Sequence, residues 1–286
     1  MPLQIRAFFH EPTHSVSYLI WDSESRRAAV IDAVLDYDGA EARTSTAFVD
    51  GIVTAIGDEG LTLYWILETH AHADHMTAAR VLKDKAGGAI VIGAGIEAVQ
   101  RTFKDIFALD DLVPDGSQFD RLVADGERLP LGKLSIEALA TPGHTPAFTS
   151  YKIEDAVFVG DTLLMPDYGT ARADFPGGDA ATLYHSIRRL LSLPPETRMF
   201  VGHDYKAAGR DVFAWETTVA EQRAHNIHVH QGVEEGAFVK LRTERDKTLT
   251  LPPLMLPALQ INVRAGQFPP PAANGSRYLK LPLNRF

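Results

Sequence analysis

The chain has 286 residues, of which 45% are hydrophobic and none is cysteine, and its formal net charge is −9. Such an apolar content can bury the core of one large domain or of two small ones. The lack of cysteine excludes disulfides, zinc–thiolate sites and a cysteine nucleophile, so any metal must be bound by nitrogen and oxygen. The negative charge provides no broad basic field, and we therefore expect no nucleic-acid partner.

The N-terminal segment has neither the basic stretch nor the uninterrupted apolar run of a secretory signal. No segment reaches the roughly 20 apolar residues that a membrane helix needs. We therefore expect no membrane association and a cytoplasmic location.

The first part of the chain predicts strands before its first helix, which is not how a Rossmann fold begins. Apolar periodicity, β-branched content and turn residues define the boundaries of these elements. The expected elements are strands at 3–9, 16–21 and 27–33, a helix at 46–56, a buried strand at 61–69, a helix at 76–85, a strand at 89–92 and a helix at 96–107.

The second half repeats this order, with strands first and helices after. The expected elements are strands at 120–123, 134–140, 149–153 and 156–159, a helix at 180–191, a strand at 199–201 and a helical segment at 213–230. Two such halves, packed sheet to sheet with helices outside, predict an α/β fold of the four-layer αββα sandwich type. Beyond Leu251 the chain is proline-rich, which predicts an extended segment on the surface.

Three imidazoles and a carboxylate lie within the six residues HAHADH, from His70 to His75, directly after the buried strand at 61–69. Residues at the carboxyl end of such a strand face the crevice where ligands bind in α/β sheets. Without a metal, these buried polar groups would each need another partner. The cluster therefore predicts a metal site.

Three further candidate ligands each follow a glycine, which lets the backbone bend so that the next side chain can point across the strand ends. They are His144 in TPGHT, Asp161 in FVGDT and His203 in FVGHD. Taken alone, each is more typical of a structural histidine or a helix cap. In the company of the HAHADH cluster they complete a set of seven nitrogen or oxygen ligands.

HAHADH, GHT, GD and GHD at these intervals resemble the metallo-β-lactamase fold superfamily, from about Ser15 to Asn226. Asp32, which closes the strand AAVID, matches a position that supports the site rather than binding metal. The resemblance implies this fold, with residues 1–230 as the catalytic domain and residues 231–286 as a C-terminal extension packed on the same domain. The fold alone does not decide the reaction, because it hosts hydrolases of several substrates as well as redox enzymes.

The segments ETHAHADH, GDTLL, ARADFPGG, TLYHSI, GHDY and ALQINVRAG are similar to those of the persulfide dioxygenases. The resemblance implies sulfide detoxification, in which glutathione persulfide is oxidised by O2 to sulfite and glutathione. It also implies one Fe(II) per chain in a facial triad with open positions for substrate and O2. The ligands would be His70, His144 and Asp161, and the groups that orient ligands or substrate would be His72, Asp74, His75 and His203.

The alternative is a dinuclear zinc hydrolase of the glyoxalase II type, or a related lactonase, in which a metal-bound hydroxide attacks a thioester carbonyl. His70, His72 and His144 would then hold one Zn(II), Asp74, His75 and His203 the other, and Asp161 would bridge them. Ligand identity alone does not separate the two enzymes. The ARADFPGG segment, the GHDY motif and a C-terminal part unlike the helical glutathione-binding domain of glyoxalase II favour the dioxygenase. A non-catalytic binding protein is disfavoured by the complete ligand set.

For the substrate, the resemblance implies that Tyr205 hydrogen-bonds the thiol compound and that Arg172 orders the pocket loop, unless Arg172 only pairs with Asp174. The carboxylates of glutathione favour cationic residues at the rim of the pocket. On the basis of charge alone, the candidates are Lys206, Arg210, Lys240, Arg242 and Arg245. The mixed charges of residues 240–247 are more typical of a solvated helix face.

The apolar segment 251–259 can cover a neighbouring subunit, so a homo-oligomer is one expectation. The histidines left out of the site, each in a predicted helical segment, are His185, His225, His228 and His230.

Overall fold

The computed structural model describes residues 2–285. Its first six-stranded sheet is built entirely from the first half of the chain, in the order β1-β2-β3-β6-β8-β9. These strands are β1 (Leu3–His10), β2 (Ser15–Asp22), β3 (Arg27–Ile31), β6 (Thr62–Leu67), β8 (Ala89–Gly93) and β9 (Arg121–Val123). A small sheet beside it joins β5 (Arg43–Ser45), β4 (Val34–Asp38) and β7 (Met76–Thr77).

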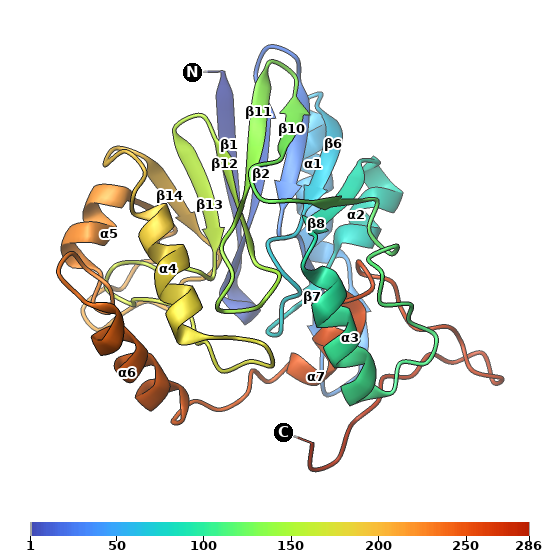
Figure 1. The fold of residues 1–286 in the computed structure, drawn as a ribbon. Coiled ribbons are helices and arrows are strands. Elements are labelled where there is room, and N and C mark those ends of the chain that lie inside the picture. Colours follow the sequence, from blue (N-terminus) through green and yellow to red (C-terminus); the bar gives the residue numbers. More distant parts are fainter. Residues whose placement is uncertain (1, 286) are drawn as a thin grey trace.

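The second six-stranded sheet follows in the chain order of its strands. They are β10 (Arg128–Leu131), β11 (Leu134–Ala140), β12 (Thr149–Ile153), β13 (Ala156–Gly160), β14 (Arg198–Val201) and β15 (Glu216–Thr218). In Figure 1 the two sheets stand at the centre of the molecule with helices on either side. The helices are α1 (Ala47–Asp58), α2 (Ala79–Ala86), α3 (Ile96–Phe107), α4 (Ala180–Leu190), α5 (Val219–His225), α6 (Glu235–Asp246) and α7 (Met255–Asn262).

Three apolar clusters correspond to the three interfaces between the layers. One lies between the first sheet and helices α1, α2, α3 and α7, one between the two sheets, and one between the second sheet and α4, α5 and α6. Strand β13 shows how a strand serves two interfaces, because Val157 and Val159 face the helices while Ala156 and Phe158 face the other sheet. The four-layer αββα sandwich is therefore confirmed.

The candidate ligands lie on loops at the carboxyl ends of parallel strands. Strands β3, β6 and β8 run parallel in the first sheet, and β13 and β14 run parallel in the second. Asp32 follows β3, the HAHADH loop follows β6, Asp161 follows β13, and His203 comes shortly after β14, while His144 comes from the loop between β11 and β12. The topology thus brings segments that are distant in sequence to one edge of the sandwich.

Two predicted helices begin later than the sequence suggested. Met76–Thr77 pairs with β4, so α2 starts at Ala79, whose backbone N–H donates to Thr77 Oγ1 at 3.0 Å. The segment 213–230 is mostly not helical, because Glu216–Thr218 pairs with β14 as an edge strand. Helix α5 then starts at a Thr218–Glu221 capping box and ends at His225, so His228 and His230 lie outside any helix.

The C-terminal part is an extended and largely exposed segment only over residues 267–285, and the residues before them depart from that expectation. Residues 255–262 form α7, whose Met255, Ala258, Leu259 and Ile261 are buried in the apolar cluster of the first sheet. Pro257 falls in the first turn of α7, where a missing N–H breaks no helical hydrogen bond. Within residues 2–285, no helix combines the length and the apolar character needed to cross a membrane.

Candidate metal centre

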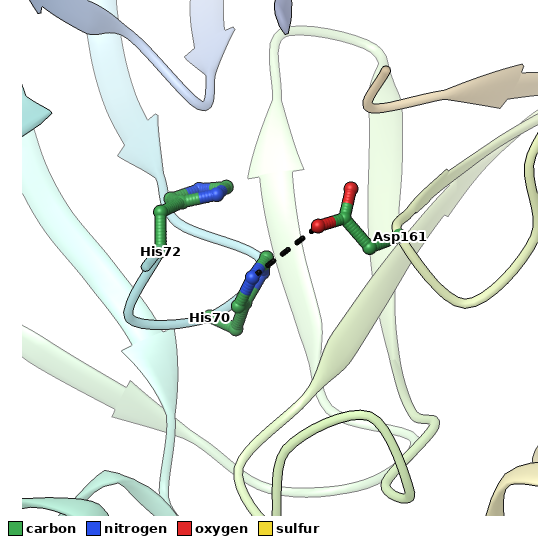
Figure 2. A group of neighbouring side chains, drawn as sticks. All are labelled: His70, His72 and Asp161. Atoms are coloured by element: carbon green, nitrogen blue, oxygen red, sulfur yellow. Dashed lines mark ion pairs between the residues drawn. The ribbon is translucent and has the colours of Figure 1, made fainter. Parts of the chain in front are cut away.

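Two imidazoles and a carboxylate converge at the edge where the loops meet. The Nε2 atoms of His70 and His144 each lie 3.7 Å from Oδ2 of Asp161, and all three residues are buried. Two ligand atoms that are each about 2.1 Å from a shared ion lie at most about 4.2 Å apart, so Asp161 Oδ2 can share an ion with the Nε2 atom of either histidine. His70, His72 and Asp161 also offer ligand atoms that all lie within 4.8 Å of one another. Figure 2 shows His70 and Asp161 pointing toward one another, with His72 on the same loop as His70.

The second ring nitrogen of each of these histidines is held by a hydrogen bond. His144 Nδ1 donates to the backbone carbonyl of Arg172 at 2.7 Å. His70 Nδ1 lies 3.0 Å from Thr69 Oγ1, and this hydroxyl donates its own proton to Asp32 Oδ2 at 2.8 Å. Thr69 must therefore accept from His70, which leaves a lone pair on Nε2 of both rings.

The His70 Nε2 atom is buried and has no hydrogen-bond partner within the described residues. A buried nitrogen of this kind costs free energy unless a partner such as a metal ion satisfies it. Two neutral histidines and a carboxylate are also a suitable donor set for a divalent transition metal. The residues therefore fit a bound metal ion.

The protonation states of the three groups suit metal binding. Burial, together with the neighbouring His72, holds the pKa of His70 well below its usual value, and burial likewise lowers the pKa of His144. For Asp161, burial acts to raise the pKa, but the neighbouring His203 outweighs it and the pKa is lowered. Both imidazoles are thus neutral and the carboxyl is ionised near neutral pH, which are the forms that bind a metal.

His203 is held between two carboxylates. Its Nδ1 lies 2.6 Å from Asp161 Oδ1, and its Nε2 lies 2.7 Å from Asp74 Oδ2. Burial acts to lower the pKa of His203, but the charges of Asp161, Tyr205 and Asp74 raise it well above the usual value. Both nitrogens of His203 therefore donate hydrogen bonds to carboxylates, and Asp74, Asp161 and His203 also offer ligand atoms that lie within 4.8 Å of one another.

The remaining histidines of the HAHADH loop are also close to carboxylates. His72 Nε2 lies 3.1 Å from Asp32 Oδ1 and 4.0 Å from Glu68 Oε2. Burial acts to lower the pKa of His72, but Asp32 and Glu68 raise it to about 9. His75 Nδ1 lies 2.9 Å from Asp74 Oδ2, while His75 Nε2 is buried without a hydrogen-bond partner in the described chain. His72, Asp74 and His75 still offer ligand atoms within 4.8 Å of one another.

Two of the glycines that precede candidate ligands are required by close packing. Gly143, before His144, has φ +133°, and a Cβ there would lie 2.3 Å from the backbone of Leu183 in α4. A Cβ on Gly202, before His203, would lie 2.7 Å from Asp161 Oδ1. The glycines therefore let the loops approach one another closely enough for the ligands to converge.

A cavity of about 180 Å³ opens beside these ligands, and its wall includes His144, Asp161 and His203. Tyr205 lines it and stacks parallel on His203, with ring centroids 5.7 Å apart and 2° between the planes. Arg172 also lines the cavity, and it forms the predicted ion pair with Asp174, from Nε at 2.5 Å and Nη2 at 2.8 Å. Its Nη1 also donates to the carbonyl of Thr250 at 2.7 Å.

Of the five cationic residues nominated by charge, Arg242 and Arg245 line the cavity. Arg242 is buried and pairs with Asp246 at 2.6 Å, so these two residues face the interior, whereas the other charged residues of this segment are exposed as the mixed charges suggested. Arg245 is exposed and forms no ion pair with another described residue. The others lie elsewhere: Arg210 pairs with Asp204 and Asp167, Lys206 lies over the Phe213 ring, and Lys240 is exposed.

The four histidines left out of the site do not line this cavity. Sequence reasoning missed several residues that contact the HAHADH loop, among them Ser15, Glu68, Thr69 and Asn262. Asn262 donates to the carbonyls of His72 and His75 from α7, almost 190 residues further along the chain. Its only signal was its place in the ALQINVRAG segment.

Residues 10–203 match the family model of the metallo-beta-lactamase superfamily. The chain is similar to a probable metallo-hydrolase of Burkholderia pseudomallei, with 50% identity over 99% of this chain and 99% of that protein. It is also similar to glyoxylase B2 of Dictyostelium discoideum, with 48% identity over 93% of this chain and 92% of that protein.

A mitochondrial persulfide dioxygenase, ETHE1 of Mus musculus, is 31% identical over 95% of this chain and 92% of its own length. Among solved structures, the crystal structure of ETHE1 from Myxococcus xanthus is 32% identical in sequence and has a TM-score of 0.74. The match covers 92% of this chain and 100% of that one.

Proposed function

Because this chain belongs to the metallo-β-lactamase superfamily, whose members are metal-dependent enzymes, we propose that it is a persulfide dioxygenase. Its substrates would be glutathione persulfide and O2, and its products glutathione and sulfite, with water supplying the third oxygen atom of sulfite. One Fe(II) ion per chain would be held by His70, His144 and Asp161. The likeness to the ETHE1 proteins in sequence and fold supports this proposal.

The main support for the proposal is that the candidate ligands differ in which of their ring nitrogens already form hydrogen bonds. His70 and His144 each present Nε2 toward the same Asp161 oxygen, with the other nitrogen already hydrogen-bonded. His203 uses both nitrogens for carboxylates instead. A mononuclear site needs only His70, His144 and Asp161 as ligands, whereas a dinuclear site needs His203 as a ligand as well.

The protein's own residues would prepare the site and receive the substrate. When bound, Fe(II) would supply the electron transfer that overcomes the spin barrier to O2 chemistry, which no side chain provides. His203 holds Oδ1 of Asp161 and so directs Oδ2 toward His70 and His144. Leu164 and Phe175 give the cavity apolar walls that exclude water, and Tyr205 provides a phenolic hydroxyl to hydrogen-bond the substrate sulfur.

A second candidate function is a dinuclear zinc hydrolase of glutathione thioesters. Two observations favour it: the unpartnered Nε2 of His75 within the His72, Asp74 and His75 cluster, and the likeness to glyoxylase B2. This candidate requires that His203 and Asp74 give up their mutual hydrogen bond to bind a second ion.

Metal content and O2 dependence separate the two candidates. We expect protein purified without added metal to carry close to one iron per chain, to consume O2 when given glutathione persulfide, and to form sulfite. As a matched control, S-lactoylglutathione is expected to remain intact in the same preparation under anaerobic conditions. Two zinc ions per chain, together with thioester turnover that persists without O2, would replace the dioxygenase by the hydrolase.

A further inference from the structure

The HAHADH loop is poorly supported by its own backbone. Residues 70–75 belong to no helix or strand, and none of them takes part in a backbone–backbone hydrogen bond with another residue of the described chain 2–285. A buried carbonyl without a partner is costly. The conformation of this loop therefore depends on side chains that reach it from elsewhere.

Asn262, in the last turn of α7, reaches the loop with its whole amide group. Its Nδ2 donates to the carbonyl oxygens of His72 and His75, each at 2.8 Å. Its Oδ1 accepts from the backbone N–H of Thr77 at 2.8 Å. The side chain is 2% exposed, so these three bonds form away from competing water.

Helix α7 is fixed firmly enough to serve as a support. Its apolar residues are buried among the side chains of the first half, and Gln100 of α3 donates from Nε2 to the carbonyl of Val263 at 2.8 Å. Just beyond the helix, Arg264 pairs with Asp111. Asn262 therefore projects from a rigid element onto a loop that has no backbone–backbone hydrogen bonds of its own within the described residues.

We propose that Asn262 is a positioning residue through which the C-terminal extension sets the geometry of the HAHADH loop and thereby the metal affinity of the site. The amide fixes the backbone on both sides of Asp74, between the carbonyls of His72 and His75 and the N–H of Thr77. The inference rests on the metal site of the proposed function but not on which reaction the metal performs.

The test compares metal affinity between variants of the full chain. Asn262→Ala removes all three hydrogen bonds, and Asn262→Asp keeps the size and the acceptor for Thr77 but removes the donors. Groups that support metal ligands change metal affinity by roughly 10- to 100-fold when replaced, and we expect a loss of about 10-fold or more for Fe(II). Affinity is measured anaerobically by competition with a chelator, and Zn(II) serves as a second probe.

Gln260 provides a matched control on the same helix. It is 1% exposed, and its amide bonds to Leu256 and Lys280 rather than to the HAHADH loop. We expect Gln260→Ala to lower the melting temperature of the metal-free protein while leaving metal affinity within about twofold of the unsubstituted chain. If Asn262→Ala behaves in the same way, Asn262 is only a structural residue and the inference is wrong.

Hydrogen exchange on the unsubstituted chain keeps the inference testable if the Asn262 variants do not fold. Adding Fe(II) or Zn(II) is expected to slow amide exchange in Met255–Asn262 several-fold, with no change in Val219–His225 on the other side of the molecule. Unchanged exchange in α7 on metal binding would overturn the inference. Failure of the unsubstituted chain to bind either metal would instead remove the proposed function itself.

Discussion

The hydroxyl of Thr69 lies between the carboxylate of Asp32 and the ring of His70, and this order decides which nitrogen of His70 is free. Because the hydroxyl donates to Asp32, it can only accept from His70 Nδ1. We expect Thr69→Val, which keeps the shape but removes the hydroxyl, to weaken metal binding by about 10-fold. Thr69→Ser keeps the hydroxyl and should retain most of the affinity in the same chelator competition. Equal losses in both variants would contradict this tautomer argument.

Arg245 is the exposed cation of the cavity wall, since Arg172 and Arg242 are occupied by Asp174 and Asp246. A carboxylate of glutathione would give it a charged hydrogen-bond partner. We expect Arg245→Ala to raise KM for glutathione persulfide by about 3- to 10-fold with little change in kcat, because the contact is partly exposed and lies away from the reacting sulfur. O2 uptake at varied substrate concentration measures both constants.

Two comparisons isolate the charge effect of Arg245. Lys240→Ala removes an exposed cation from the same helix that does not line the cavity, and it should leave KM unchanged. A small persulfide without carboxylates should show the same KM with both the unsubstituted chain and Arg245→Ala. A KM increase that persists with this second substrate would mean that Arg245 acts on the cavity shape instead.

At the scale of secondary structure, local patterns predicted the elements that are stabilised locally. The predicted helix 96–107 coincides with α3, which has apolar residues at Ile96, Val99, Phe103 and Phe107 on its buried face. The predicted helical segment 213–230 is mostly wrong, because Glu216–Thr218 pairs with β14. Strand β14 lies outside this segment, so the local pattern of the segment could not show the pairing. In the same way, HAHADH and the glycine-linked ligands were visible as motifs, whereas the support from Asn262 depends on where α7 packs.

The turn before His144 shows how one element fixes a ligand on another. Gly143 accepts from the N–H of Asp179, and its missing Cβ makes room for Leu183 in the first turn of α4. We expect Gly143→Ala to lower the free energy of unfolding by about 1–3 kcal/mol and to weaken metal binding, because the turn must move away from α4 and carry His144 with it. Urea unfolding of the metal-free protein and chelator competition measure the two effects.

Gly126→Ala is the matched control for backbone strain. Gly126 has φ +75°, but nothing lies within 4 Å of a Cβ at that position. Its substitution should cost roughly 1 kcal/mol through the left-handed conformation alone and should not affect metal affinity. If Gly143→Ala lowers stability no more than Gly126→Ala does and leaves metal affinity intact, the contact with α4 does not position His144.

At the scale of the whole molecule, the two halves are joined at both ends of the sandwich. The metal centre joins them at one edge, through His70 from the first half and His144 and Asp161 from the second. Strand β2 runs antiparallel to β3, so its last residue, Asp22, lies at the opposite edge from Asp32. There Asp22 Oδ2 accepts from the backbone N–H of Lys133, between β10 and β11 of the second half, at 2.9 Å.

This contact between Asp22 and the backbone of Lys133 is expected to stabilise the fold without affecting the metal centre. Burial acts to raise the pKa of Asp22, but hydrogen bonds from the Lys133 backbone and the Ser25 hydroxyl outweigh it and lower the pKa to about 2. The unfolded value is about 3.9. A carboxyl whose pKa is lower in the folded state stabilises the fold above its unfolded pKa, and this stabilisation is lost as the pH falls through the folded pKa.

We therefore expect Asp22→Asn to lower the free energy of unfolding at pH 7 by about 1–3 kcal/mol, because an amide N–H would replace an acceptor of the Lys133 and Ser25 bonds. The difference from the unsubstituted chain should stay constant above about pH 5 and shrink between about pH 4 and about pH 2. Glu24→Gln, which only breaks an exposed pair with the Lys133 side chain, should change stability by less than about 1 kcal/mol at any pH. Urea unfolding across this pH range measures both variants, and a pH-independent difference for Asp22→Asn would show that the charge of Asp22 does not join the two halves.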